Sequence, residues 1–343
     1  MQNPFTLVFG KSPLESISRL AQTNEIIDSF SSEWMNQQIY MITGVRGSGK
    51  TVMLTDISKH FRKDKDWIVI ELNPDRDLLH SFAAKLYDQK NLKDLFIKAK
   101  LDLSVLGIGV SIEKSNPFFD IENAIQAMLE VVKDKRKRVL ITIDEATSKE
   151  EMKIFASAFQ IFVRNELPVF LLMTGLFENI DALQNEKNLT FLYRAPKIKL
   201  QPLDKGAVKQ KYQEIFGFSS DDALAMADMT KGYPFAFQVL GYLTWQKDGD
   251  YKSVVGIYRQ YLSEYVYDKI WSELSNKDKK ICYGIAETDS GKIKEIREKL
   301  SLKTNEFNPY RDRLKKRGII NCEEHGYVHF ALPEFDEYVL THV

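Results

Sequence analysis

Apolar runs rich in β-branched residues alternate with longer amphipathic stretches over the first part of the chain. The runs that predict strands are Ile39–Thr43, Trp67–Leu72, Val139–Ile143, Val169–Thr174 and Ile198–Leu200. The stretches that predict helices are Asn24–Phe30, Lys50–Arg62, Leu78–Gln89, Ile121–Lys133, Glu150–Arg164 and Leu176–Ala182. Such alternation is typical of parallel sheets, because parallel neighbours need a long crossover between them. The pattern therefore predicts an α/β core with a mostly parallel sheet between helices.

One stretch before the third strand departs from this rhythm. Leu101–Val105 alternates between apolar and polar positions. Gly107 and Gly109 interrupt the alternation, and Val110–Glu113 resumes it. Glycines between two alternating runs favour a hairpin. We expect an inserted β-hairpin here, which serves either as a surface flap or as a contact element.

The second part of the chain predicts helices without intervening strands. The expected helices after Pro202 are Lys205–Phe216, Asp221–Thr230, Pro234–Trp245 and Tyr251–Tyr267. From Ile270 we expect helices at Lys277–Glu287, Ile293–Leu300 and Asn305–Arg317, then strands at Ile319–Cys322 and Tyr327–Ala331. Three helices followed by a hairpin indicate a winged helix. The predicted domains are residues 1–203, 204–268 and 269–343.

Composition narrows the choice of partner and compartment only slightly. The 343 residues suffice for two or three domains. The 48 basic residues equal the 48 acidic ones, which removes any overall attraction to nucleic acid or to an anionic membrane. Cys282 and Cys322 lack metal-ligand spacing and suit reduced thiols. Without a leader or an apolar run long enough to span a bilayer, we expect a cytoplasmic protein that has no membrane partner.

The segment between the first strand and its helix matches the pattern G-x-x-x-x-G-K-[ST]. Its residues are Gly44, Val45, Arg46, Gly47, Ser48, Gly49, Lys50 and Thr51. The glycines let backbone N–H groups surround a phosphate chain, and the positive end of the following helix faces the same place. Lys50 adds a point charge and Thr51 a ligand for Mg2+. The segment predicts a phosphate loop that binds a nucleotide with magnesium.

Two adjacent carboxylates, Asp144 and Glu145, follow the buried-type strand Val139–Ile143. We expect Asp144 to hold the magnesium shell that Thr51 also contacts. Glu145 is the candidate that polarises the attacking water. The competing interpretation is a pair of solvated acids that open the next helix, where negative charge is favourable.

Two further side chains are candidates for contact with the third phosphate. Thr174 ends a core strand. Its hydroxyl could sense the γ-phosphate, or it could form hydrogen bonds with backbone groups at the end of the strand. Arg194 precedes the fifth strand and could reach the nucleotide of a neighbouring subunit, which would require a homo-oligomer. The alternative for Arg194 is a surface arginine that covers apolar neighbours.

The order of these motifs along the chain resembles that of the AAA+ and STAND-like ATPases. The motifs are the phosphate loop, Asp144-Glu145, Thr174, Arg194, a helical domain and a winged helix. The resemblance is strongest to the origin-recognition-type branch, and it covers nearly the whole chain. It implies a P-loop NTPase core, an all-α lid, a winged-helix domain, and ATP and ADP as ligands. Gly232-Tyr233-Pro234 resembles the glycine-x-proline motif by which STAND-type lids approach the nucleotide, so Gly232 and Pro234 are candidate binding residues. The uncharged run Phe235–Leu240 lacks the lid arginine of many AAA+ proteins.

The opening segment also looks like that of a group of uncharacterised bacterial ATP-binding proteins. The matching residues are Asn3-Pro4-Phe5, Phe9-Gly10-Lys11 and Pro13. In that group the segment lines the adenine pocket and leads to a Gly-Arg pair. Here Ser18-Arg19 takes that place, and the glycine is missing.

The expected output of the C-terminal domain is contact with either duplex DNA or a protein. Its basic residues are Arg311, Arg313, Lys315, Lys316 and Arg317, with Lys277, Lys279 and Lys280 nearby. Such a strip could contact phosphates. However, the segment from Ile270 onward holds equal numbers of basic and acidic side chains, and the wing tip carries Glu323-Glu324. His325 and His329 are interpreted as ordinary strand residues.

These features together predict a slow, magnesium-dependent ATPase that acts as a nucleotide-controlled switch with a winged-helix output. One alternative is an ATP-dependent DNA-binding protein of the initiator or mobile-element kind. Another is a STAND-like signalling scaffold that contacts protein partners. A P-loop kinase is disfavoured, because Asp144-Glu145 beside Thr174 and a long lid suit hydrolysis better than transfer to an acceptor.

Overall fold

The computed structural model describes residues 2–8, 13–34, 36–109 and 117–342. The chain forms two compact units. The sheet unit consists of Arg19–Thr43 and Lys50–Lys199. The helical unit consists of Met1–Ser18, Gly44–Gly49 and Leu200–Val343. None of the helices in the described part of the chain is both long and apolar enough to cross a membrane.

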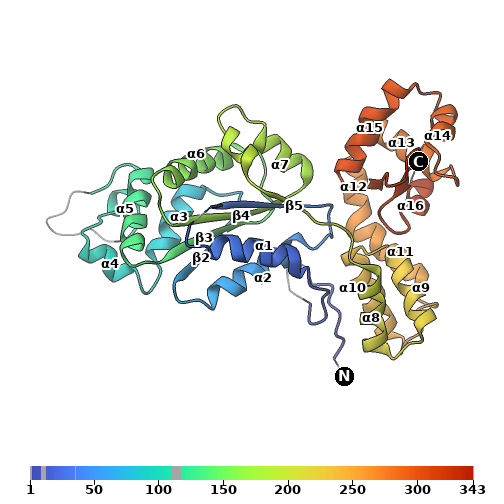
Figure 1. Cartoon of the computed structure of the whole chain (residues 1–343), viewed down its shortest axis with the longest axis horizontal. Helices are drawn as coiled ribbons and strands as arrows, with labels where there is room; N and C mark the ends of the chain where they lie inside the picture. The colour runs from blue at the N-terminus through green and yellow to red at the C-terminus, as the bar shows by residue number, and fades with distance from the viewer. Residues whose placement is uncertain (1, 9–12, 35, 110–116, 343) are drawn as a thin grey trace. The chain divides into compact units, whose positions relative to one another are not determined.

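The sheet unit is built on a five-stranded sheet in the order β2-β3-β4-β1-β5, and all its neighbouring pairs are parallel (Figure 1). The strands are β1 (Ile39–Thr43), β2 (Trp67–Leu72), β3 (Arg138–Ile143), β4 (Val169–Gly175) and β5 (Lys197–Lys199). The predicted α/β fold class is confirmed. Parallel strands have their carboxyl ends at one edge, so Asp144 after β3 and Thr174 near the end of β4 share that edge.

Helices cover both faces of this sheet. They are α1 (Leu20–Ser31), α2 (Lys50–Arg62), α3 (Leu78–Tyr87), α4 (Lys93–Lys98), α5 (Ile121–Asp134), α6 (Glu150–Arg164) and α7 (Phe177–Gln184). Figure 1 shows α1 and α2 on one face, and α6 and α7 on the other. On the first face, Phe30 of α1 packs with ring centroids 5.5 Å from Tyr40 and 5.2 Å from Phe170. On the other face, Phe155 and Phe159 of α6 are fully buried in the main apolar core.

The prediction of a hairpin before β3 is wrong for its first arm, Leu101–Val105. Its second arm, Val110–Glu113, lies outside the described residues. Asp102 forms only an isolated parallel bridge with Pro117, and Ser104–Leu106 is a short 3₁₀ helix. The Asp102 carboxylate accepts hydrogen bonds from the Ser104 N–H at 3.0 Å and its hydroxyl at 2.6 Å. This local turn competes with strand pairing, as short polar side chains often do.

Helices make up most of the helical unit, as the pattern predicts. They are α8 (Lys205–Phe216), α9 (Ser220–Thr230), α10 (Pro234–Gln246), α11 (Val255–Leu262), α12 (Asp268–Ser272), α13 (Asn276–Ala286), α14 (Ile293–Leu300), α15 (Thr304–Lys316) and α16 (Phe335–Thr341). A π-helical turn, Ser263–Tyr267, joins α11 to α12. Two short antiparallel strands, β6 (Ile320–Asn321) and β7 (His329–Phe330), follow α15. Burial raises the pKa of the Cys282 thiol, which suits a packing role for this cysteine.

The first residues of the chain pack into the helical unit. The Phe5 ring is 3% exposed and lies with its centroid 5.8 Å from Phe216 and 5.5 Å from Phe237. Gly241 leaves room for it, since a Cβ there would lie 2.3 Å from the ring. The Gln238 side chain also accepts a hydrogen bond from the Thr6 N–H at 3.0 Å. The N-terminal segment is therefore part of the core of this unit.

Phe5→Ala is expected to lower the free energy of unfolding by about 3–5 kcal/mol, because it leaves an aromatic-sized cavity in this core. Val8→Ala is the matched control, since Val8 lies in the same segment and is 64% exposed; it should change stability by less than about 0.5 kcal/mol. Urea unfolding of both variants measures the difference. Equal stability of the two variants would contradict the anchoring of this segment.

Candidate functional site

Asp144 receives hydrogen bonds from two threonines at the carboxyl edge of the sheet. It follows β3, and its Oδ2 accepts from the Thr51 hydroxyl at 2.7 Å. Its Oδ1 accepts from the hydroxyl of Thr174, which is fully buried in β4. Thr51 lies in the first turn of α2, next to Lys50. The structure thus brings together Thr51, Asp144 and Thr174, three of the residues predicted from the sequence.

Glu145 follows with an unusual backbone. Its φ of 56° lies in the left-handed region, which is costly for a residue other than glycine. Its N–H donates to Asp144 Oδ1 at 3.1 Å and to Thr174 Oγ1 at 3.3 Å. The Glu145 side chain is exposed. Strain of this kind gathers at functional sites, where the surroundings must hold it, and here Asp144 and Thr174 hold it.

The phosphate loop Gly44–Gly49 belongs to the helical unit and contains a tight turn. The Ser48 N–H donates to the Val45 carbonyl at 3.2 Å, and Gly47 has a φ of +71°. A turn with its third residue in this conformation needs glycine there, as in a type II turn. Gly49 has a φ of +89°. The glycines predicted to let the backbone wrap a phosphate therefore occupy positions that require them.

The segment Gly232-Tyr233-Pro234 lies directly against this loop. The Tyr233 hydroxyl donates to the Arg46 carbonyl, and the Phe235 N–H donates to the Gly47 carbonyl at 3.2 Å. Gly232 has a φ of +68°, and a Cβ on it would lie 2.4 Å from the Leu203 carbonyl oxygen. Pro234 is the first residue of α10, a position that does not need a proline N–H.

A second contact reaches the loop from the start of the C-terminal region. Arg46 Nη2 lies 2.8 Å from Glu273 Oε1, and the two side chains are 31% and 26% exposed. Glu273 is the C-cap residue that follows α12, and its carboxylate also lies 3.4 Å from the Lys269 ammonium and 3.8 Å from the Arg317 guanidinium. Sequence reasoning missed Tyr233 as a contact and missed Glu273 entirely. Only the flanking Gly232 and Pro234 carried a signal, and Glu273 carried none.

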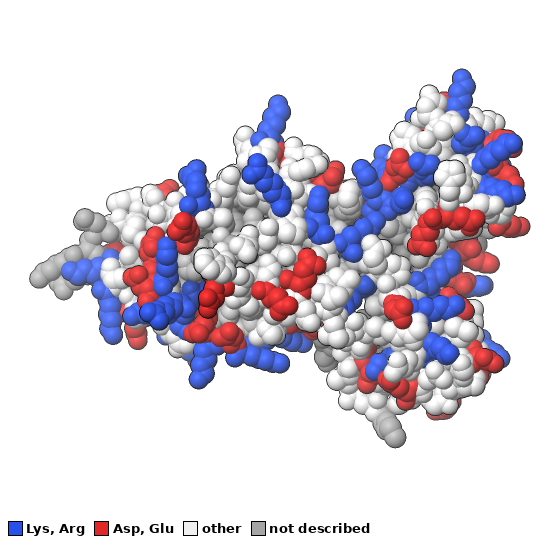
Figure 2. All heavy atoms as spheres, in the orientation of Figure 1, with Lys and Arg blue, Asp and Glu red and all other residues white. Residues whose placement is uncertain are grey.

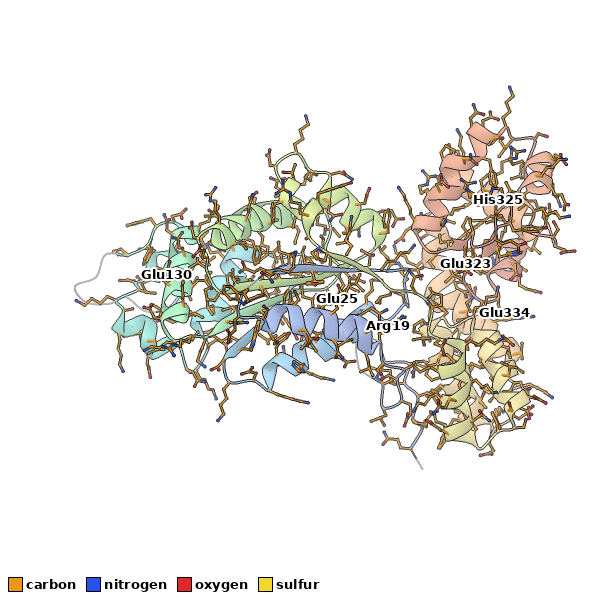
Figure 3. All side chains as sticks on the ribbon, viewed as in Figure 1. Arg19, Glu25, Glu130, Glu323, His325 and Glu334 are labelled. Atoms are coloured by element: carbon orange, nitrogen blue, oxygen red, sulfur yellow. The ribbon has the colours of Figure 1, made fainter. Side chains whose placement is uncertain are left out.

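The remaining predicted residues are more scattered. Arg194 is exposed at the end of the 3₁₀ helix Thr190–Arg194, and its role toward a neighbouring subunit stays a prediction. Arg19 directly precedes α1 (Figure 3), and burial lowers the pKa of its guanidinium. Phe9-Gly10-Lys11 lies outside the described residues. Glu323 and His325, labelled in Figure 3, are exposed on the turn between β6 and β7.

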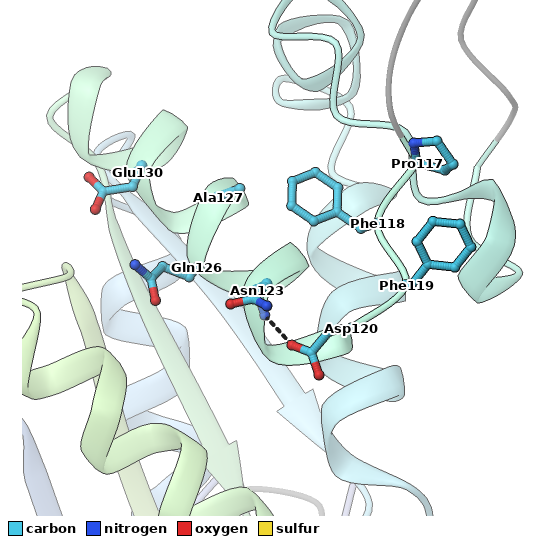
Figure 4. Close-up of a pocket in the computed structure, with 8 residues that line it drawn as sticks. All are labelled: Pro117, Phe118, Phe119, Asp120, Asn123, Gln126, Ala127 and Glu130. Atoms are coloured by element: carbon cyan, nitrogen blue, oxygen red, sulfur yellow. Dashed lines mark hydrogen bonds between the residues drawn. The ribbon is translucent and has the colours of Figure 1, made fainter.

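The sheet unit also contains an open groove of about 550 Å³ (Figure 4). Its lining residues are Pro117, Phe118, Phe119, Asp120, Asn123, Gln126, Ala127 and Glu130. The Asp120 carboxylate caps α5 by accepting from the Asn123 N–H at 2.8 Å. None of the residues predicted to bind nucleotide lines this groove. Its polar lining, Asp120, Asn123, Gln126 and Glu130, comes from α5 and the residue that caps it.

Two family models match the chain. An ATPase domain found predominantly in Archaea matches residues 24–193. A domain of unknown function (DUF8462) matches residues 264–339. No curated protein matches the chain. The ATPase match includes the phosphate loop, Asp144-Glu145 and Thr174.

Solved structures show the same fold at low sequence identity. The Walker-type ATPase paby2304 of Pyrococcus abyssi is 16% identical, with a TM-score of 0.67 over 95% of this chain and 96% of that chain. The ORC2 protein of Aeropyrum pernix, solved in ADPNP–ADP complexes, is 12% identical, with a TM-score of 0.59 over 97% and 96% of the two chains. Residues 24–193 therefore match an ATPase domain of the P-loop type, and the chain has the fold of these two solved proteins.

Proposed function

We propose that the protein is an ATP-binding, magnesium-dependent switch whose C-terminal winged helix is the output module. In this proposal residues 1–203 bind the nucleotide, residues 204–268 form a lid, and residues 269–343 form the winged helix. The observation that carries the proposal is that one carboxylate, that of Asp144, accepts hydrogen bonds from both the Thr51 and the Thr174 hydroxyls. It joins the helix after the phosphate loop to the ends of two core strands.

The donor set at Asp144 fits Mg2+. Magnesium in nucleotide sites takes one or two protein oxygens, and phosphates and waters supply the rest. The Thr51 hydroxyl and the Asp144 carboxylate lie 2.7 Å apart and are such oxygens. When bound, the ion would neutralise charge on the phosphates. Thr174 keeps the Asp144 carboxylate in position, and its role as a sensor of the γ-phosphate remains a proposal.

Each remaining residue has one task in this proposal. The amides of Gly44–Gly49 grip the phosphates, and Lys50, the next residue along the chain, adds a positive charge. Glu145 accepts a proton from the attacking water, since its carboxylate is exposed while its backbone is fixed. Arg46 links the loop to Glu273, so a change in the loop would reach α12. That link supports a switch in which the C-terminal region responds to the nucleotide.

Glu145→Gln is expected to lower steady-state ATP hydrolysis by about 100-fold or more, because a positioned general base contributes at least that much. Binding of ATP should remain, since Gln keeps the size of the side chain. Glu150→Gln is the control, as Glu150 is an exposed acid at the start of α6. Equal hydrolysis by wild type and Glu145→Gln would remove Glu145 from the mechanism.

Asp144→Asn should weaken the dependence of ATP binding on magnesium. We expect wild type to bind ATP more tightly with Mg2+ than with chelator, and the variant to lose about tenfold or more of that gain. Asp181→Asn, a change at an exposed carboxylate on α7, is the control. Calorimetric titrations with and without the ion measure the difference. A variant with an unchanged magnesium effect would contradict the assignment.

The charges of the C-terminal region favour a protein partner over duplex DNA. Figure 2 shows basic and acidic side chains interspersed over it. Several predicted DNA contacts are already paired: Arg311 with Asp312 at 2.7 Å, Arg313 with Asp278 at 2.6 Å, and Arg317 with Glu273 at 3.8 Å. Asp278 is 1% exposed, so Arg313 is needed to compensate a buried charge. These pairs reduce the positive field that DNA binding needs.

With ATP and Mg2+ present, the protein should therefore bind duplex DNA only as weakly as in non-specific binding. The expected dissociation constant is above about 1 μM at physiological salt. Fluorescence anisotropy over a range of salt concentrations measures this. Tighter binding that falls with salt, and that is lost in Lys315→Glu, would assign the output to DNA instead.

A further inference from the structure

Two consecutive carbonyls of the phosphate loop are held by the segment before and at the start of α10. The Tyr233 hydroxyl donates to the Arg46 carbonyl, and the Phe235 N–H donates to the Gly47 carbonyl at 3.2 Å. Phe235 lies in the first turn of α10, where backbone N–H groups have no partner within the helix. The helix start thus supplies one donor, and a side chain supplies the other.

The geometry of a peptide bond turns this contact into control over a donor. A trans peptide directs its N–H opposite to its carbonyl, and the described residues contain no cis peptide bond. The Arg46 carbonyl shares its peptide plane with the Gly47 N–H. That N–H therefore points away from Tyr233. It meets no acceptor among the residues that the structure describes, so it remains available to a phosphate oxygen.

Tyr233 is well suited to hold this peptide. Its side chain is 4% exposed, and burial raises the pKa of its phenol against the opposing effect of the Arg46 charge. The phenol therefore stays protonated and keeps donating at physiological pH. The packing is close, because a Cβ on Gly47 would lie 2.2 Å from the Tyr233 hydroxyl oxygen. Glu273 restrains the Arg46 side chain of the same turn at 2.8 Å.

We propose that Tyr233 is a positioning residue for nucleotide binding, which fixes the Arg46–Gly47 peptide so that the Gly47 N–H is ready for a phosphate. This inference rests on the proposed nucleotide site and adds to it a residue outside the phosphate-loop motif. Tyr233 acts from the carbonyl side of the loop and does not itself touch the nucleotide.

Loss of this hydroxyl should weaken nucleotide binding moderately. A single hydrogen bond of this kind makes a modest net contribution, which corresponds to about three- to tenfold in affinity. The loop amides serve phosphates that ATP and ADP both carry, so the two nucleotides should lose affinity to a similar degree. The turnover rate at saturating ATP should change less than the affinity, because the chemistry depends on Asp144 and Glu145.

The experiment compares Tyr233→Phe with Tyr258→Phe in the full-length protein. Tyr258 is also fully buried in the helical unit, and its hydroxyl donates to the Met229 carbonyl at 2.9 Å. It therefore controls for the loss of a buried phenol hydrogen bond without a loop contact. Calorimetric titration with Mg-ATP and Mg-ADP gives the dissociation constants, and thermal unfolding gives the stability of each variant. We expect similar losses of stability but weaker nucleotide binding only in Tyr233→Phe.

Three results would overturn the inference, and they are distinguishable. If wild type binds nucleotide and Tyr233→Phe binds it equally well or more tightly, the peptide does not need the phenol. If Tyr258→Phe weakens binding to the same extent, the effect is a general loosening of the helical unit. If wild type binds neither nucleotide, the proposed function fails as well, and the inference fails with it.

Discussion

The carboxylate of Asp144 connects three elements of the sheet unit through its hydrogen bonds, and the proposed nucleotide site depends on it. One oxygen accepts from Thr51 at the start of α2, and the other accepts from Thr174 at the end of β4. The strand order makes this meeting possible, because β4 lies between β3 and β1. Each segment alone would present an isolated polar side chain. Held together, they form an oxygen-rich cluster, which is the reason for proposing a magnesium ion there.

The phosphate loop is constrained by a different set of groups, all within the helical unit. Its turn needs glycine at Gly47, and its carbonyls accept hydrogen bonds from Tyr233 and Phe235. A loop whose carbonyls are already satisfied has its amide orientations set before any ligand arrives. Such preorganisation lowers the entropic cost of binding. The contact of Arg46 with Glu273 adds a connection to the residue that follows α12.

The C-terminal region is not a simple basic surface, because several of its arginines form ion pairs with acidic side chains. Arg313 compensates Asp278, which is almost completely buried, and Arg317 approaches Glu273. Removing Arg313 would leave the buried Asp278 carboxylate without its compensating charge, so this arginine has a structural role. The exposed turn that carries Glu323 and His325 is the more accessible part of the hairpin. Because the ion pairs of these arginines reduce the positive field that DNA binding needs, we favour a protein partner.

The sequence by itself determined the α/β core and most element boundaries, and its motifs singled out the predicted phosphate loop and the candidates Asp144 and Thr174, which the structure brings into contact. Those features rest on local periodicity and on motifs of adjacent residues, which a single chain displays directly. It did not predict the turn at Asp102, because a side-chain hydrogen bond displaced the strand there. Only the tertiary structure decided that Tyr233 and Glu273 hold the loop. Both reach it from positions far away along the chain, and contacts between such distant residues leave no periodic signal in a sequence.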